Sequence, residues 1–174
     1  MDEPAPRPIR PILLVGMPGS GKSTIAPLLA AHLGRPAHDV DALVETRLGM
    51  SIARIFARHG ERGFRAEEKE LIAALLAGPA AVIAAGGGAF LDPETRALVL
   101  ERGYAIWLDA DLVTLTARGL DGATRPLLAE PGRLAALKAS RDPVYALAQV
   151  RVDAGQPPDA IVAAIVTALA EPAR

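Results

Sequence analysis

Residues 11–23 read PILLVGMPGSGKS, in which a short apolar run passes directly into a glycine-rich turn that ends in Lys22 and Ser23. Residues 16–23 fit the pattern G-x-x-x-x-G-K-[ST], and a helical stretch follows from residue 22 to residue 33. In this context the glycines let backbone N–H groups point at phosphate oxygens, and the helix N-terminus adds partial positive charge. The alternative is a glycine turn that happens to carry a lysine, and such a turn rarely matches both the pattern and its context. The stretch therefore predicts a phosphate-binding loop.

The side chains of this loop have the chemistry that a nucleoside triphosphate needs. We expect Lys22 to bridge the β- and γ-phosphates and the Ser23 hydroxyl to ligate Mg²⁺. The co-substrate is then ATP with Mg²⁺ as the cofactor, since the sequence holds no N-K-x-D segment that would read guanine. The nucleotide-binding residues expected in the loop are Gly19, Ser20, Gly21, Lys22, Ser23 and Thr24.

Short apolar runs alternate with longer amphipathic ones along the chain, which is typical of an α/β fold with a parallel sheet. Strands are predicted at residues 11–15, 36–38, 80–85, 104–108 and 149–152. Helices are predicted at residues 22–33, 52–59, 61–77 and 93–102 and from about residue 159. Residues 1–10 are predicted to be a flexible lead-in and residues 11–174 a single domain. The stretch from 119 to 132 is rich in Gly, Pro and charge, which favours a mobile lid.

Composition excludes several classes of partner. The 174 residues carry a formal net charge of −1, so no overall field attracts nucleic acid or an anionic membrane. The absence of Cys excludes disulfides and a thiolate metal site. No apolar run is long enough to suggest a signal peptide or a membrane span, so we expect a cytoplasmic protein.

Two carboxylates, Asp39 and Asp41, follow the second predicted strand. Ligands of open parallel sheets bind beyond the carboxyl ends of the strands, so one carboxylate could hold Mg²⁺ through water and the other could accept a hydroxyl proton. An Asp in such a turn is as often a helix cap, and the spacing alone leaves both interpretations open.

Two further patterns are ambiguous by themselves. Arg65 and Glu68 lie three residues apart on a predicted helix, a spacing that favours a surface ion pair. Gly86, Gly87 and Gly88 end the third predicted strand, where bare backbone could approach a ligand or could simply form a tight turn.

In combination these segments resemble the shikimate kinase family over about residues 11–168. The motifs stand in the family's order and spacing: residues 16–24, Asp39-x-Asp41, residues 49–56, Phe64-Arg65-x-x-Glu68, residues 86–88, residues 125–128 (RPLL) and Arg141-x-x-x-Tyr145. The resemblance implies a three-layer P-loop fold, with a five-stranded parallel sheet flanked by helices and a lid. It also implies that the γ-phosphate of ATP is transferred to the 3-hydroxyl of shikimate, a step toward chorismate, by a monomer.

The resemblance also implies roles for individual residues. The catalytic residues are Lys22, Asp41 as the base, and Arg125, which swings over the phosphates. Arg118 lies near the adenine or phosphate end, and Asp39 joins Ser23 around Mg²⁺. The acceptor is bound by Asp41, Arg65, Gly86, Gly87, Gly88 and Arg141, with both arginines on its carboxylate. These residue types suit the ligand, because a guanidinium binds a carboxylate through two hydrogen bonds.

The sequence departs from the family at Ala85, where Thr is frequent, and at Met17 and Pro18 in the loop. Two alternatives remain open at this stage. The chain could phosphorylate another metabolite such as gluconate, or it could be a regulatory nucleotide-binding module without catalysis. The arginine pattern and the triple glycine disfavour the first, and the intact Lys22, Ser23 and aspartates disfavour the second.

Overall fold

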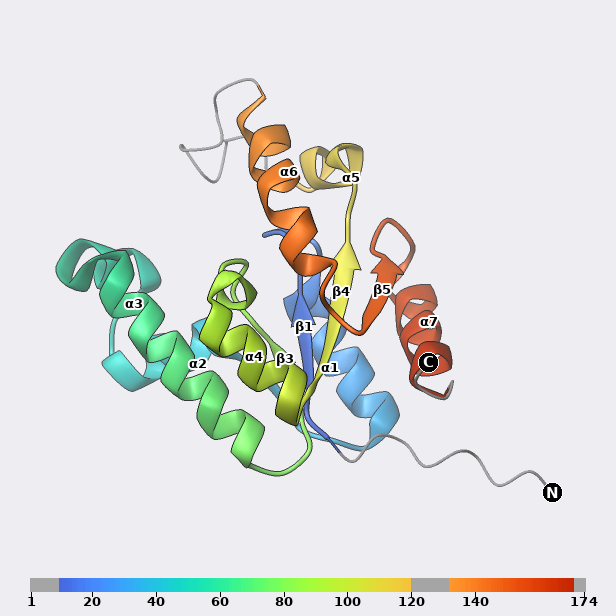
Figure 1. Ribbon diagram of the computed structural model, residues 1–174, viewed down its shortest axis with the longest axis horizontal. Helices are drawn as coiled ribbons and strands as arrows, with labels where there is room; N and C mark the ends of the chain where they lie inside the picture. The colour runs from blue at the N-terminus through green and yellow to red at the C-terminus, as the bar shows by residue number, and fades with distance from the viewer. Residues whose placement is uncertain (1–9, 120–131, 171–174) are drawn as a thin grey trace.

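A computed structural model of the chain describes residues 10–119 and 132–170, and Figure 1 shows its strands enclosed by helices. In chain order the elements are β1 Ile12–Val15, α1 Lys22–Leu33, β2 Ala37–Asp39, α2 Val40–Leu48, α3 Ile52–Ala77, β3 Val82–Ala84, the 3₁₀ helix η1 Ala89–Leu91, α4 Pro93–Arg102, β4 Tyr104–Asp109, α5 Leu112–Ala117, α6 Arg133–Tyr145, β5 Val150–Asp153 and α7 Pro158–Ala170. Most of the predicted lead-in and residues 120–131 of the predicted lid lie outside the described ranges.

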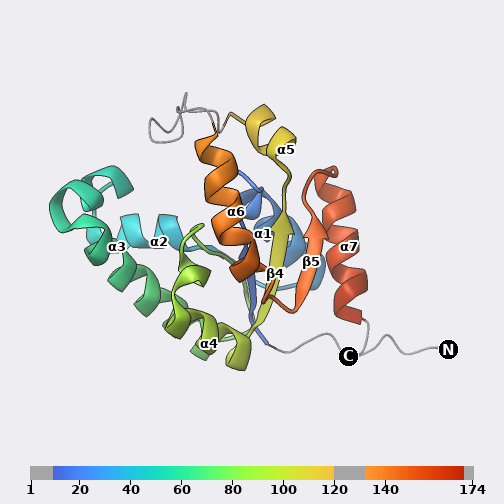
Figure 2. The same ribbon diagram turned by 45° about the horizontal axis from the view of Figure 1, so that its top comes forward.

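The strands form one five-stranded sheet in the order β2-β3-β1-β4-β5, and every pairing is parallel. This confirms the predicted fold class. Strand β1 is central and completely buried, as expected for an apolar strand covered on both faces. Helices α1 and α7 pack together, α3 packs with α4, and the two pairs lie on opposite sides of the strands (Figures 1 and 2).

Local signals explain most of the helix ends. Asp92 caps α4 by accepting a hydrogen bond from the Thr95 backbone N–H, and Pro93 occupies the first turn. Ser51 caps α3 in the same way. The predicted break between residues 59 and 61 is confirmed, because Gly60 has φ 68° and ψ 177° inside an otherwise continuous α3.

Three helices, α2, α5 and α6, occupy stretches for which the sequence made no assignment. Helix α5 has only six residues, and α6 buries only Tyr145 completely, so neither presents a strong apolar stripe. In Figure 1 α5 stands beyond the arrowhead of β4, and α6 runs from beside that arrowhead up past the carboxyl end of the sheet. Within the described ranges, no helix is both long and apolar enough to cross a membrane.

Candidate active site

The phosphate-binding loop lies where the sequence predicted it, between central strand β1 and helix α1. Gly16 and Gly21 have φ values of 143° and 100°, a region that residues with a side chain rarely adopt. A Cβ on Gly16 would also lie 2.6 Å from the Leu108 carbonyl oxygen, so the loop packs directly on β4. The two glycines therefore serve the turn itself, while α1 directs its N-terminus at the space that the loop encloses.

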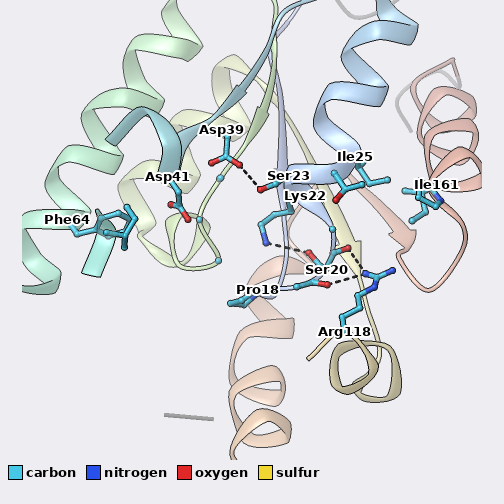
Figure 3. A pocket seen from close by; sticks show the side chains of 18 of the residues that line it. Pro18, Ser20, Lys22, Ser23, Ile25, Asp39, Asp41, Phe64, Arg118 and Ile161 are labelled. Carbon is cyan, nitrogen blue, oxygen red and sulfur yellow. Dashed lines mark hydrogen bonds between the residues drawn. The ribbon is translucent and has the colours of Figure 1, made fainter. Parts of the chain in front are cut away.

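Lys22 is the first residue of α1, and its side chain folds back over the loop (Figure 3). Its Nζ donates hydrogen bonds to the carbonyl oxygens of Gly16 and Met17, each at 2.8 Å, and it contacts Ser20 Oγ at 3.4 Å. The residue is only 7% exposed. The ammonium group is thus held inside the loop, where it can meet a bound phosphate without a large rearrangement.

Asp39 caps a helix with one carboxylate oxygen and contacts the phosphate loop with the other. Its Oδ1 accepts a hydrogen bond from the Ala42 backbone N–H at 3.2 Å and caps α2. Its Oδ2 accepts a hydrogen bond from Ser23 Oγ at 2.5 Å, as Figure 3 shows. A hydroxyl and a carboxylate at this distance are hard oxygen donors, and Mg²⁺ commonly uses one or two such protein ligands together with phosphate and water. The pair fits the magnesium ligands expected from the sequence.

Both groups border a pocket of about 660 Å³ beyond the carboxyl ends of the strands. Ile52, Phe56 and Phe64 form an apolar wall on the α3 side, and Pro158 and Ile161 lie at the far end beside α7. Asp41 points into the space between Phe64 and the loop (Figure 3). Of the residues expected at the site, the pocket is lined by Gly19, Ser20, Gly21, Lys22, Ser23, Thr24, Asp39, Asp41, Arg65, Gly86, Gly87 and Arg118.

The three consecutive glycines each leave room for a different side chain of the site. A Cβ on Gly86 would overlap Glu68 and lie 3.2 Å from Asp41 Oδ1. A Cβ on Gly87 would lie 3.3 Å from Arg141 Nη1 and 2.9 Å from Pro18 of the phosphate loop. On Gly88 it would overlap the guanidinium of Arg65. The close approach of these side chains, and not only a tight turn, accounts for the glycines.

Arg65 and Glu68 do form the i, i+3 ion pair, with Nη1 2.6 Å from Oε2, but a surface pair is the wrong description of it. Glu68 is only 2% exposed, while the Arg65 side chain is 33% exposed. Burial raises the pKa of Glu68 above its usual range, and the neighbouring Arg65 charge offsets part of that rise. Glu68 therefore acts as a buried acceptor that holds the Arg65 guanidinium beside Gly88.

Arg141 does not border the large pocket. It borders a neighbouring one of about 630 Å³, which Arg65 and Gly88 also line. One helical turn later, Tyr145 is fully buried, and its hydroxyl donates a 2.5 Å hydrogen bond to the Gly87 carbonyl oxygen. Burial raises the pKa of Tyr145, and the Arg141 charge lowers it in part. The Arg141-x-x-x-Tyr145 spacing thus ties α6 to the triple glycine, a role that the sequence did not indicate for Tyr145.

Arg118 lies at the phosphate end, within the range that the sequence left open. Its Nη1 donates to the carbonyl oxygens of Gly19 and Ser20, each at 3.1 Å, and its Nη2 donates to Ala154 at 2.8 Å. It therefore joins the phosphate loop to the turn between β5 and α7. Arg125 lies outside the described residues.

Comparison with known proteins gives a consistent picture. A family model described as shikimate kinase matches residues 18–170. A shikimate kinase of Zymomonas mobilis is 49% identical over 164 residues, covering 92% of this chain and 93% of the relative. One from Symbiobacterium thermophilum is 50% identical, covering 81% and 84%.

Solved structures agree with the sequence relatives. Shikimate kinase from Acinetobacter baumannii in complex with shikimate superposes with a TM-score of 0.84 at 31% identity, over 92% of this chain and 93% of that one. A gluconokinase from Sinorhizobium meliloti shares the fold more distantly, with a TM-score of 0.63 at 19% identity over 95% of this chain and 94% of that one.

Proposed function

The chain belongs to the shikimate kinase family, and from that premise we propose how its pocket divides the reaction among its side chains. The enzyme transfers the γ-phosphoryl group of ATP to the 3-hydroxyl of shikimate, which gives ADP and shikimate 3-phosphate. One observation carries the assignment of roles: a single pocket brings together the phosphate loop, Asp41 and the Arg65 guanidinium.

ATP occupies the end of the pocket formed by the phosphate loop. Backbone N–H groups of Gly19 and Gly21 and the N-terminus of α1 face the phosphates, the Ser20 side chain lines the same space, and Lys22 stands beside the β- and γ-phosphates. Arg118 lies beside the same loop, so its charge adds to the positive field there. Arg125 is proposed to neutralise charge on the transferring group, as the family motif suggests.

Ser23 and Asp39, whose side-chain oxygens lie together beside the phosphate loop, would hold Mg²⁺. The Ser23 hydroxyl would serve as a ligand and Asp39 would act through water, in keeping with the low number of protein ligands typical of magnesium. A bound ion would supply positive charge to the phosphate oxygens. Within the described residues, no group of three or more His, Asp or Glu side chains offers a competing metal site.

Shikimate occupies the end of the pocket near α3. Its carboxylate points toward the neighbouring pocket, where it faces Arg65, which lines both pockets, and Arg141, which lines only the second. The two arginines approach Gly88 and Gly87 from different helices. Its hydroxyls face Asp41, and its ring lies against the apolar wall of α3. A ligand with a carboxylate at one end and hydroxyls at the other is thereby fixed in one orientation, because the charges at the two ends of its subsite differ in sign.

Phosphoryl transfer then needs positioning more than covalent help from the protein. The 3-hydroxyl oxygen forms a bond to the γ-phosphorus while the bond from that phosphorus to the β–γ bridging oxygen breaks, and Asp41 takes the hydroxyl proton. Negative charge that spreads over the phosphoryl oxygens and the ADP leaving group meets Lys22 and the loop N–H groups. No covalent intermediate with the enzyme is required.

A coupled assay of ADP release separates this function from its rivals. The purified chain is given ATP with shikimate, gluconate, a nucleoside monophosphate or no acceptor. We expect shikimate alone to raise ADP release well above the level without acceptor. Greater ADP release with gluconate would show that gluconate, and not shikimate, is the acceptor. Equal ADP release with every acceptor and without one would favour a nucleotide-binding module.

Two further expectations concern assembly and location. We propose that the enzyme works as a monomer in the cytoplasm, in line with the family resemblance. Size-exclusion chromatography with light scattering checks the first expectation, and a mass near twice 18.1 kDa would contradict it.

A further inference from the structure

A compact cluster of charges joins helix α6 to the end of strand β4. Lys138 Nζ donates hydrogen bonds to Asp109 Oδ1 at 2.9 Å and to Asp142 Oδ2 at 2.7 Å. Arg151 of β5 holds the other oxygen of Asp109, with Nη2 at 2.6 Å. Lys138 is only 13% exposed, and its Nζ lies 5.8 Å from the centroid of the Trp107 ring. The cluster therefore links two strands of the sheet to one helix through a largely buried cation.

Elsewhere α6 is attached by Tyr145 and by apolar side chains that are only partly buried against the core, namely Leu134, Leu137 and Val144. Among its residues only Tyr145 is completely buried, and that side chain is fixed to the Gly87 carbonyl oxygen. Figures 1 and 2 both show α6 lying beside β4, at the carboxyl end of the sheet. Arg141 stands between the two attachments, three residues after Lys138 and four before Tyr145. Residues at these spacings share one helix face, so both attachments constrain the face that carries Arg141.

We propose that Lys138 is a positioning residue, which fixes α6 to Asp109 and thereby places the Arg141 guanidinium for the carboxylate of the acceptor. The inference rests on the proposed role of Arg141 in binding that carboxylate. Lys138 itself borders neither pocket, and it acts on the reaction only through the placement of its helix.

The electrostatics of the cluster suit a fixed attachment. Burial by itself would lower the pKa of Lys138, but the hydrogen bonds to Asp142 and Asp109 outweigh it and the pKa is raised, so the ammonium stays charged throughout the neutral range. A neutral residue at position 138 would leave Asp142 beside Asp109 without the cation that joins them. The bond to Asp142 lies within α6 and orients the Lys138 side chain, while the bond to Asp109 joins the helix to β4. Because partly buried charges are screened less than exposed ones, the bond to Asp109 holds the helix more firmly than a surface ion pair would.

Steady-state kinetics of Lys138→Met, with shikimate and ATP varied separately, test the proposal. We expect the KM for shikimate to rise about 5- to 20-fold while kcat and the KM for ATP stay within about 3-fold. Lys138→Arg keeps the charge and should restore most of the affinity. Arg47→Met is the matched control, because Arg47 also bridges two carboxylates, Glu67 and Glu70, but borders neither pocket and does not contact α6.

A double variant tests whether Lys138 acts through Arg141. If it does, Lys138→Met added to Arg141→Ala should raise the KM for shikimate no more than about 2-fold beyond Arg141→Ala alone. Independent, multiplying losses would overturn the inference, as would equal increases in both KM values for Lys138→Met. An unchanged KM for Lys138→Met beside a raised one for Arg141→Ala would refute the positioning role alone. An unchanged KM for Arg141→Ala would refute the role of Arg141 and this inference with it.

Discussion

Gly88→Ala separates the position of Arg65 from the stability of the fold. The backbone of Gly88 has φ −98° and ψ −13°, values that alanine adopts without strain. The new Cβ, however, would lie 2.5 Å from Arg65 Cζ and 2.8 Å from Nη1, and closer still to Nη2. Since 3.4 Å is an ordinary contact distance, the guanidinium must retreat by about 1 Å or turn away from Glu68.

The size of the effect follows from what the guanidinium loses. A hydrogen bond between charged groups contributes about 1.5 to 3 kcal/mol, and each 1.4 kcal/mol is about a factor of ten. We therefore expect kcat/KM for shikimate to fall about 10- to 100-fold, mainly through KM. The KM for ATP should not change, because Gly88 does not border the phosphate loop. The melting temperature should stay within about 4 °C, since a Gly→Ala change at compatible angles stabilises a fold slightly.

Gly78→Ala is the matched control. Gly78 follows α3 at the far end from the site, its φ is −87°, and a Cβ there would meet its nearest neighbours at 3.5 Å. Kinetics and thermal melts of both variants would be measured side by side. An unchanged KM for shikimate in Gly88→Ala, with a normal melt, would refute the placement of Arg65 against the acceptor carboxylate.

Three other changes test single groups of the site. Lys22→Met should lower kcat about 10²- to 10³-fold with little change in the melting temperature, because the ammonium acts on charge that develops during transfer; a near-normal kcat would contradict this. Asp41→Asn should lower kcat about 10²- to 10⁴-fold with a small change in KM, since a carboxamide cannot take the proton; a loss confined to KM would make Asp41 a binding group only. Because the pKa of Glu68 is raised above 4.5, the folded chain binds more protons than the unfolded chain between pH 4.5 and that raised pKa. Over that range the free energy of unfolding should fall with rising pH, relative to Glu68→Gln, by at most about 1.4 kcal/mol per pH unit. Urea titrations of both proteins at several pH values measure this slope. The opposite slope would be inconsistent with a buried carboxylate whose charged form is destabilised by burial.

The sequence predicted those features that depend on neighbouring residues. The phosphate loop, the helix at residues 93–102 and the break at Gly60 each follow from a few consecutive side chains, and the structure confirms all three. Helix α6 was not predicted, because it has one fully buried residue and therefore no regular apolar stripe. A helix that has neither a distinctive end nor periodic burial is therefore not recognised from its local sequence.

Charge pairing was much harder to predict. The sequence spacing of Arg65 and Glu68 indicated a pair, but the burial of Glu68 depends on its packing beside Gly86, which spacing does not reveal. Lys138 and Asp109 are 29 positions apart, so no local pattern indicates their contact. Such contacts depend on the sheet order, which places the ends of β1, β3 and β4 beside one another.

The triple glycine shows how a short motif can carry more than one requirement. A tight turn would need at most one residue with unusual backbone angles, yet none of the three glycines has a positive φ. What they share is the lack of a side chain: Gly86 makes room for Glu68 beside Asp41, Gly87 for Pro18 and Arg141, and Gly88 for Arg65. Because β3 lies next to β1, the row begins near the phosphate loop, and Gly87 meets Pro18 of that loop. The motif therefore sets the distance between the groups proposed to bind the acceptor and the phosphate that the enzyme transfers.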